Sequence, residues 1–169
     1  MLKILVIDDN EAHRKSAIQT LQGHHVVVRD NYDDALEILE VRHGRFEESP
    51  MKWDVVLVDL LMPGGQYQQA RPRLTGEEAM GFPLALLAAQ RGVKLVGVVS
   101  DGNHHSHPAC AALDFLSGFG KMHPEADSLP TTFTINGSKV GFFHAPMVEV
   151  EGKWVKDWGR VLTFLTTGA

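Results

Sequence analysis

Three aspartates directly follow apolar runs that are typical of buried strands. Asp8 and Asp9 follow the run Ile4–Ile7, and Asp59 ends the run Val55–Val58. The carboxyl ends of neighbouring parallel strands meet at one edge of a sheet, so these carboxylates would repel one another unless a cation sits among them. A single aspartate at a strand end is more often a helix cap. A consecutive pair with a third at the neighbouring strand end instead favours a site for Mg²⁺, which prefers oxygen ligands.

The elements that must position these carboxylates alternate along the first two thirds of the chain. The apolar runs predict strands over about 4–7, 25–28, 53–59 and 93–99. The helical spacing predicts helices over about 10–21, 31–41, 82–90 and 108–117. This alternation predicts an α/β fold with a doubly wound parallel sheet. The segment of about 61–81 is too long for an ordinary connection between a strand and a helix, and we expect an inserted, mobile loop there.

The last third of the chain has a different pattern. Thr132–Ile135, Asn136-Gly137 and Lys139–His144 together form the strongest hairpin signature in the sequence. The apolar spacing over Trp154–Thr166 predicts a closing amphipathic helix. A length of 169 residues fits one domain, 1–169, with insertions at about 61–81 and 118–138.

Composition excludes several classes of protein. Sixteen Lys and Arg against 21 Asp and Glu give a formal charge of −5, so we expect no nucleic-acid partner. The chain contains no uncharged apolar stretch long enough to span a membrane. Its single cysteine, Cys110, cannot form an internal disulfide, and we expect a cytoplasmic protein.

Three segments resemble the receiver domain of two-component response regulators. They are Leu5–Asn10, Asp54–Pro63 and Val96–Ser100, which hold an acidic pair, a D-x-x-M-P string and a hydroxyl in the family's order. The resemblance implies a flavodoxin-like sheet of five parallel strands. It also implies a histidine kinase or phosphotransfer protein as phosphodonor, and a downstream protein as target.

The resemblance also implies roles for single residues. Asp59 would be the phosphoacceptor, and Asp8, Asp9 and Asp59 would bind Mg²⁺. The backbone carbonyl of Leu61 would complete the metal shell, and the Ser100 hydroxyl would donate a hydrogen bond to the phosphoryl group. Asp59 would then act as the nucleophile while the metal neutralises charge on the phosphoryl group.

The receiver lysine is the point where the sequence departs from the family. A typical receiver has Lys-Pro at the end of strand five. Lys121 lies at about the right distance along the chain, but its surroundings are glycine-rich and lack a strand. Alternatively, 139–144 is strand five and Ala145-Pro146 falls where Lys-Pro should be. We prefer this alignment because a helix-forming segment follows it, and then His144 or a Lys or Arg of the inserted loop would have to replace the lysine.

Histidines gather just past the fourth predicted strand. His104, His105 and His107 lie within four residues, and with His144 they form a possible second metal or anion site. Histidine clusters beside carboxylates can bind Zn²⁺. The preferred alternative is a polar loop in which they cap the following helix or face water, since adjacent histidines rarely point the same way.

Three functions remain open from the sequence. The first is an atypical stand-alone receiver that acts on a partner protein, because no output domain is expected after Ala169. The second is a small metal-dependent phosphohydrolase that uses the Asp and His residues. The third is a pseudo-receiver, an interaction module without phosphotransfer. Loss of the lysine favours the third, whereas retention of the three aspartates and Ser100 favours the first.

Overall fold

A computed structural model describes residues 1–40, 52–66, 76–102, 105, 107–116 and 130–168. The strands are β1 (Lys3–Ile7), β2 (His25–Arg29), β3 (Val55–Asp59), β4 (Met62–Pro63), β5 (Glu77–Glu78), β6 (Leu95–Ser100), β7 (Thr132–Ile135), β8 (Ser138–His144), β9 (Met147–Val150) and β10 (Lys153–Lys156). The helices are α1 (Glu11–Thr20), α2 (Tyr32–Glu40), α4 (Gly81–Gln90), α5 (Pro108–Leu113) and α6 (Trp158–Thr167).

The central sheet confirms the predicted α/β fold. Its strand order is β2-β1-β3-β6-β8-β7, and the first five strands are parallel. β8 is therefore the fifth parallel strand, as the preferred alignment predicted. β7 is the other arm of the predicted hairpin, and it pairs with β8 as an antiparallel edge strand beside the five parallel ones. The reason is the predicted hairpin turn at Asn136 and Gly137, whose positive φ angles of 51° and 80° fold the chain straight back.

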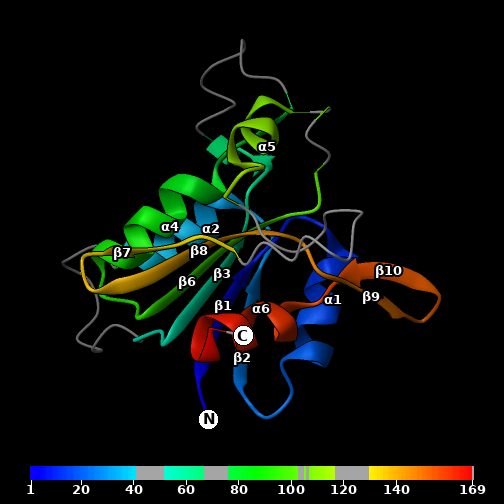
Figure 1. Ribbon diagram of the computed structural model, residues 1–169, viewed down its shortest axis with the longest axis horizontal. Coiled ribbons are helices and arrows are strands. Elements are labelled where there is room, and N and C mark those ends of the chain that lie inside the picture. Colours follow the sequence, from blue (N-terminus) through cyan, green and yellow to red (C-terminus); the bar gives the residue numbers. More distant parts are fainter. Residues whose placement is uncertain (41–51, 67–75, 103–104, 106, 117–129, 169) are drawn as a thin grey trace.

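Helices cover both faces of the sheet, and each face has its own core (Figure 1). Leu5 and Ile7 of β1 pack with the cluster that includes residues of α2 and α4. Ile4 and Val6 pack with the cluster of α1 and α6. All four side chains are fully buried, which explains why the strand is a continuous apolar run rather than an alternating one.

The predicted helix over Trp154–Thr166 is wrong in its first turn. Residues 153–156 form β10, which pairs with β9 in a separate two-stranded hairpin, and α6 begins only at Trp158. Glu151 and Gly152 form the turn with φ angles of 51° and 76°. The side chain of Asp157 accepts a hydrogen bond from the Arg160 N–H and so starts the helix. The spacing was ambiguous because Val155 and Trp158 are both buried, although they belong to different elements.

The two predicted insertions are described only in part. The ends of the first form a short ladder in which Met62 pairs with Glu78 and Pro63 with Glu77. Residues 67–75 between them, the middle of the expected mobile loop, lie outside the described residues. The same holds for residues 118–129 of the second insertion, which include Lys121.

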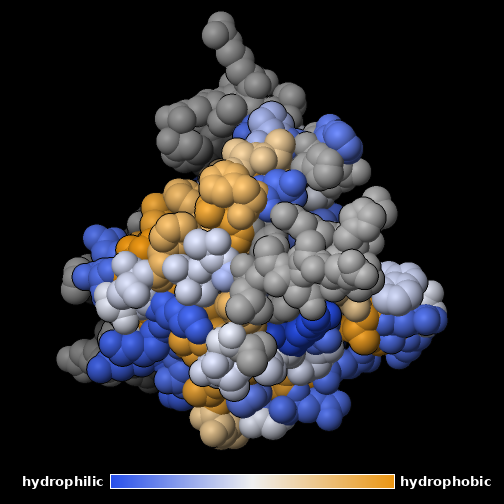
Figure 2. All heavy atoms as spheres, in the orientation of Figure 1, coloured by the Kyte–Doolittle hydropathy of each residue, from blue (hydrophilic) through white to orange (hydrophobic). Residues whose placement is uncertain are grey.

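Exposed apolar side chains gather on one side of the molecule, over α4 and around α5 (Figure 2). Phe82 and Leu86 of α4 are each 40% exposed, and Phe115 is 77% exposed. Phe142 stacks on Phe82 with ring centroids 5.9 Å apart, so this apolar surface continues from the core of the sheet. Across the described ranges, no helix is both long enough and apolar enough to cross a membrane.

The two hairpin turns provide a matched test of local strain. Glu151 has the same φ of 51° as Asn136, but glutamate tolerates this left-handed conformation less well than asparagine. We expect Glu151→Asn to raise the free energy of unfolding by about 0.5–1 kcal/mol. Asn136→Glu should lower it by at least as much, because it also removes the hydrogen bond from Asn136 Nδ2 to the Ala89 carbonyl. Denaturant titration of both variants measures this. Equal effects of the same sign would contradict it.

Candidate functional site

The three predicted aspartates come together at the carboxyl ends of two adjacent strands. Asp8 follows β1 and Asp59 ends β3, and these strands are hydrogen-bonded neighbours. One carboxylate oxygen from each of Asp8, Asp9 and Asp59 lies within 4.8 Å of the others. Asp8 is fully buried, whereas Asp9 and Asp59 line a cavity of about 360 Å³. Its other lining residues are Asn10, His13, Leu61, Glu77, Ser100, Asp101 and Gly102.

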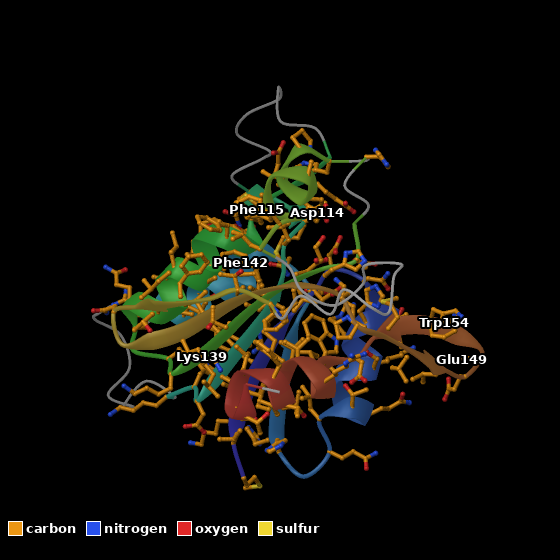
Figure 3. All side chains as sticks on the ribbon, in the orientation of Figure 1. Asp114, Phe115, Lys139, Phe142, Glu149 and Trp154 are labelled. Carbon is orange, nitrogen blue, oxygen red and sulfur yellow. The ribbon has the colours of Figure 1, made fainter. Side chains whose placement is uncertain are left out.

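A lysine that the sequence analysis did not identify lies among these carboxylates. The Nζ atom of Lys156 is 2.8 Å from Asp8 Oδ2, 3.0 Å from Asp59 Oδ1 and 3.1 Å from Asp101 Oδ1. Its side chain is completely buried. Lys156 is the last residue of β10, on the hairpin that Figure 3 marks with Trp154 and Glu149. The charge predicted to be missing is therefore present, but it comes from a different element.

Contacts with α1 and α6 fix the position of Lys156. Its backbone N–H donates to His13 Nδ1 at 3.3 Å, and its carbonyl accepts from Ser16 Oγ at 2.6 Å. The indole of Trp158 donates to the His13 carbonyl at 2.9 Å, and its ring lies 5.6 Å from Lys156 Nζ. The lysine is thus held by its backbone on both sides and by a cation–π contact at its end.

Burial and charge act against each other at this site. Burial raises the pKa of Asp59 to about 7, with Lys156 opposing the shift and Asp8 reinforcing it. Burial acts to lower the pKa of Lys156, but the surrounding charges of Asp59, Asp8 and Asp101 raise it. Burial also raises the pKa of Asp9, and the charge of Asp8 adds to this. The ammonium is therefore charged, while burial disfavours the ionised form of the Asp59 and Asp9 carboxyl groups.

The donor set fits a hard divalent cation. Asp59 Oδ1 is buried and accepts no hydrogen bond, even though it lies at ion-pair distance from the lysine. Such an oxygen retains lone pairs for another ligand, and a set made only of carboxylate oxygens suits Mg²⁺ rather than Zn²⁺. Leu61, whose carbonyl was predicted to complete this shell, lines the same cavity.

Ser100 also lies at this edge of the sheet. It ends β6, the strand next to β3, and its hydroxyl oxygen accepts a hydrogen bond from the Gly102 N–H at 3.1 Å. Cys110 Sγ lies 3.4 Å from the same oxygen. A side chain at position 102 would meet both of these atoms, so glycine there keeps the hydroxyl next to the cavity.

The predicted histidine site does not form among the residues that the structure describes. His107 caps α5, because its Nδ1 accepts a hydrogen bond from the Ala109 N–H at 3.1 Å. His144 ends β8 opposite Ser100, and neither it nor His105 belongs to a group of three metal-binding side chains. His104 lies outside the described residues. For His107 the helix-capping alternative is confirmed.

The residues offered as replacements for the lysine have different outcomes. Lys121 and residues 67–75 of the inserted loop lie outside the described ranges. His144 is half-buried on β8 and makes none of the ion pairs that the described part of the site contains. One signal for the hairpin was present in the sequence, since Val148, Glu149 and Val150 alternate directly before Glu151-Gly152 and the apolar Trp154 and Val155 follow this turn. That pattern predicts a strand at Lys156 but gives no indication that its side chain reaches Asp8.

Comparison with known proteins gives two similarities. The chain is 30% identical over 93 residues to protein PilH of Pseudomonas aeruginosa, across 53% of this chain and 69% of that protein. It is also similar to the N-terminal domain of a response regulator/sensory box/GGDEF three-domain protein from Carboxydothermus hydrogenoformans. That crystal structure has a TM-score of 0.41 and 20% sequence identity, over 63% of this chain and 68% of the other. No family model matches the chain.

The raised pKa of Asp59 makes a pH-dependent prediction. Its folded value of about 7 lies above the unfolded value of 3.8, so the contribution of this group to stability is full below about pH 4 and is lost as pH rises through about 7. Asp59→Asn removes this pH-dependent loss of stability, because an amide does not ionise. Measured in a chelator, its free energy of unfolding relative to wild type should increase by on the order of 2 kcal/mol between about pH 5 and about pH 8.

Glu149→Gln is the matched control, because Glu149 is an exposed carboxylate on the hairpin. It should show no comparable change with pH. A difference between Asp59→Asn and wild type that is the same at both pH values would contradict the pKa shift.

Proposed function

The chain belongs to the receiver family of two-component response regulators, and from that premise we propose that it accepts a phosphoryl group on Asp59 and signals through protein partners. The observation that carries the proposal is the ammonium of Lys156 among Asp8, Asp59 and Asp101. It supplies the positive charge that phosphoryl transfer to a buried carboxylate needs, at a position where the sequence alone indicated none.

Asp59 is the nucleophile in this proposal. A carboxylate oxygen attacks the phosphorus of the donor, the bond from phosphorus to the donor's nitrogen or oxygen breaks, and the leaving group keeps the electron pair. Only the ionised carboxylate can attack, and the pKa of about 7 that burial gives Asp59 leaves it partly protonated near neutral pH. Positive charge close to Asp59 favours the ionised form.

Mg²⁺ would supply part of that charge and neutralise the oxygens of the phosphoryl group when bound. Asp8, Asp9 and Asp59 would hold the ion, with the carbonyl of Leu61 as a further ligand. The closeness of the three carboxylates and the unbonded Asp59 Oδ1 support this assignment.

Ser100 and Lys156 act on the phosphoryl group from the protein side. The Ser100 hydroxyl would donate to one phosphoryl oxygen, because it lines the cavity that Asp59 also lines. Lys156 would pair with another, because its ammonium is already 3.0 Å from Asp59 Oδ1. Pairing with the phosphoryl group would then shift Ser100 and Lys156, and with them the ends of β6 and β10.

The partners are proposed from the family. A histidine kinase or phosphotransfer protein would supply the phosphoryl group, and a downstream protein would bind the phosphorylated form. The pseudo-receiver alternative depended on a missing lysine, which Lys156 supplies. The phosphohydrolase alternative depended on histidines, and in the described region only His13 lines the cavity, with both ring nitrogens engaged by protein groups.

Intact-mass measurement tests the proposal directly. With acetyl phosphate and Mg²⁺, wild type should gain one labile phosphoryl group, and Asp59→Asn should gain none. Lys156→Gln should be labelled at least tenfold more slowly, because one charged donor near the transferring group is worth on the order of 10² in rate.

Other outcomes separate the alternatives. An adduct that persists in Asp59→Asn would show that Asp59 is not the phosphoacceptor. Steady release of phosphate from unrelated phosphate esters would favour the hydrolase, and an unlabelled wild type would favour the pseudo-receiver.

The metal assignment has its own test. We expect Mg²⁺ to bind weakly, and Asp9→Asn to weaken this binding by roughly tenfold, because it removes one anionic ligand. Calorimetric titration measures both affinities, with Glu149→Gln as the control for a loss of surface charge. An unchanged affinity in Asp9→Asn would show that the ion binds elsewhere.

A further inference from the structure

A fourth carboxylate belongs to the site without being one of its proposed ligands. Asp101 directly follows Ser100 and uses both of its oxygens. Oδ1 lies 3.1 Å from Lys156 Nζ, and Oδ2 lies 3.1 Å from His13 Nε2. Asp101 is not in the group of three carboxylates that lie within metal-binding distance of one another. Its contacts are therefore with the lysine and the histidine rather than with the cation position.

His13 has a fixed orientation toward Asp101. The ring is buried, and its Nδ1 accepts the backbone N–H of Lys156, so the ring proton is on Nε2 and is donated to Asp101. The His13 carbonyl is held by the indole of Trp158. One side chain of α1 therefore holds both the backbone of the lysine and the carboxylate that pairs with its ammonium.

The ammonium has as many donors as it has carboxylates around it. A lysine ammonium carries three N–H groups, and Nζ lies within 3.1 Å of one oxygen from each of Asp8, Asp59 and Asp101. If Asp101 is removed, the same charge is shared by Asp8 and Asp59 alone. These are two of the three carboxylates that would bind the cation, so the lysine would then compete with the cation for them.

The net charge of the site also predicts that removing Asp101 weakens the binding of a cation. Asp8, Asp9, Asp59 and Asp101, when ionised, contribute four negative charges against one positive charge from Lys156, which leaves three negative. Replacing Asp101 by a neutral residue leaves two. A divalent cation is attracted less strongly to the smaller charge, even though none of its ligands has changed.

We propose that Asp101, oriented by His13, is a positioning residue that shares the ammonium of Lys156 with Asp8 and Asp59, so that the lysine competes less with the cation and the incoming phosphoryl group for these two carboxylates. The proposal rests on the function proposed for Asp59. Asp101 acts through the lysine and touches neither the acceptor nor the proposed metal ligands.

The test compares Mg²⁺ affinity and labelling rate across three full-length variants. Asp101→Asn keeps the shape of the side chain and removes its charge, and the site tolerates replacement because 41% of the side chain is exposed. We expect roughly tenfold weaker Mg²⁺ binding by calorimetry and roughly tenfold slower labelling by acetyl phosphate.

Two variants of His13 separate positioning from a merely structural role. His13→Gln places an amide donor near the position of Nε2 and can still hold Asp101, whereas His13→Asn places an oxygen near the position of Nδ1 and can hold only the Lys156 backbone. Labelling should stay close to wild type in His13→Gln and fall toward the Asp101→Asn rate in His13→Asn. A structural role for His13 would lower the stability of both without this ordering.

The outcomes distinguish this inference from the proposed function. Suppose that wild type is labelled on Asp59, and that Asp101→Asn has the same Mg²⁺ affinity and labelling rate as wild type. The positioning role is then overturned, and the receiver function stands. If wild type is not labelled at all, the receiver function fails, and the Mg²⁺ affinities of the two His13 variants, which keep all four carboxylates, still decide whether Asp101 governs the lysine. The reverse ordering of the two His13 variants would also overturn the proposal.

Discussion

The buried ammonium of Lys156 is the interaction on which the site depends. Asp8 and Asp59 are held at adjacent strand ends with almost no exposure to water, and two ionised carboxylates in such a position repel each other strongly. A buried ion pair offsets its desolvation only when its geometry is good and its remaining groups are bonded. Lys156 meets the first of these conditions, because its Nζ atom donates a hydrogen bond to Asp8 Oδ2 at 2.8 Å and lies within 3.1 Å of oxygens of Asp59 and Asp101.

The elements around the lysine follow from this requirement. The hairpin of β9 and β10 brings Lys156 to the sheet edge, and α6 begins two residues later, so that the indole of Trp158 lies beneath the ammonium. α1 supplies His13 and Ser16 to the backbone of the same lysine. The hairpin, α1 and α6 are therefore connected to the acidic site by hydrogen bonds of buried groups. In the proposed function, a charge added at Asp59 would act on all three elements through one side chain.

The sequence predicted the parts of this structure that local pattern determines. Buried parallel strands are continuous apolar runs, and a carboxylate that ends such a run must lie at the carboxyl edge of the sheet, so Asp8 and Asp59 could be placed together from spacing alone. The turn at Asn136-Gly137 was equally local. Lys156 could not be placed in this way. It is separated from Asp8 by 148 positions, and its neighbours Val155 and Trp158 fit a helix as well as a strand followed by a helix.

The requirement at the acidic edge is for a positive charge at a point in space, not for a lysine at a point in the sequence. The end of β8, where the family places its lysine, carries His144 and then Ala145. A lysine at the end of β8 and a lysine at the end of β10 are electrostatically equivalent if the ammonium of each reaches Asp8 and Asp59. The reason is that the Coulomb energy depends only on the separation of the charges and on their surroundings. They differ in what else they contact. Entry from β10 brings the lysine between Asp101 and Trp158, so its position depends on α1 and the hairpin as well as on the sheet. This second dependence makes Asp101 and His13 part of the site, although neither lies among the residues that the family resemblance assigned.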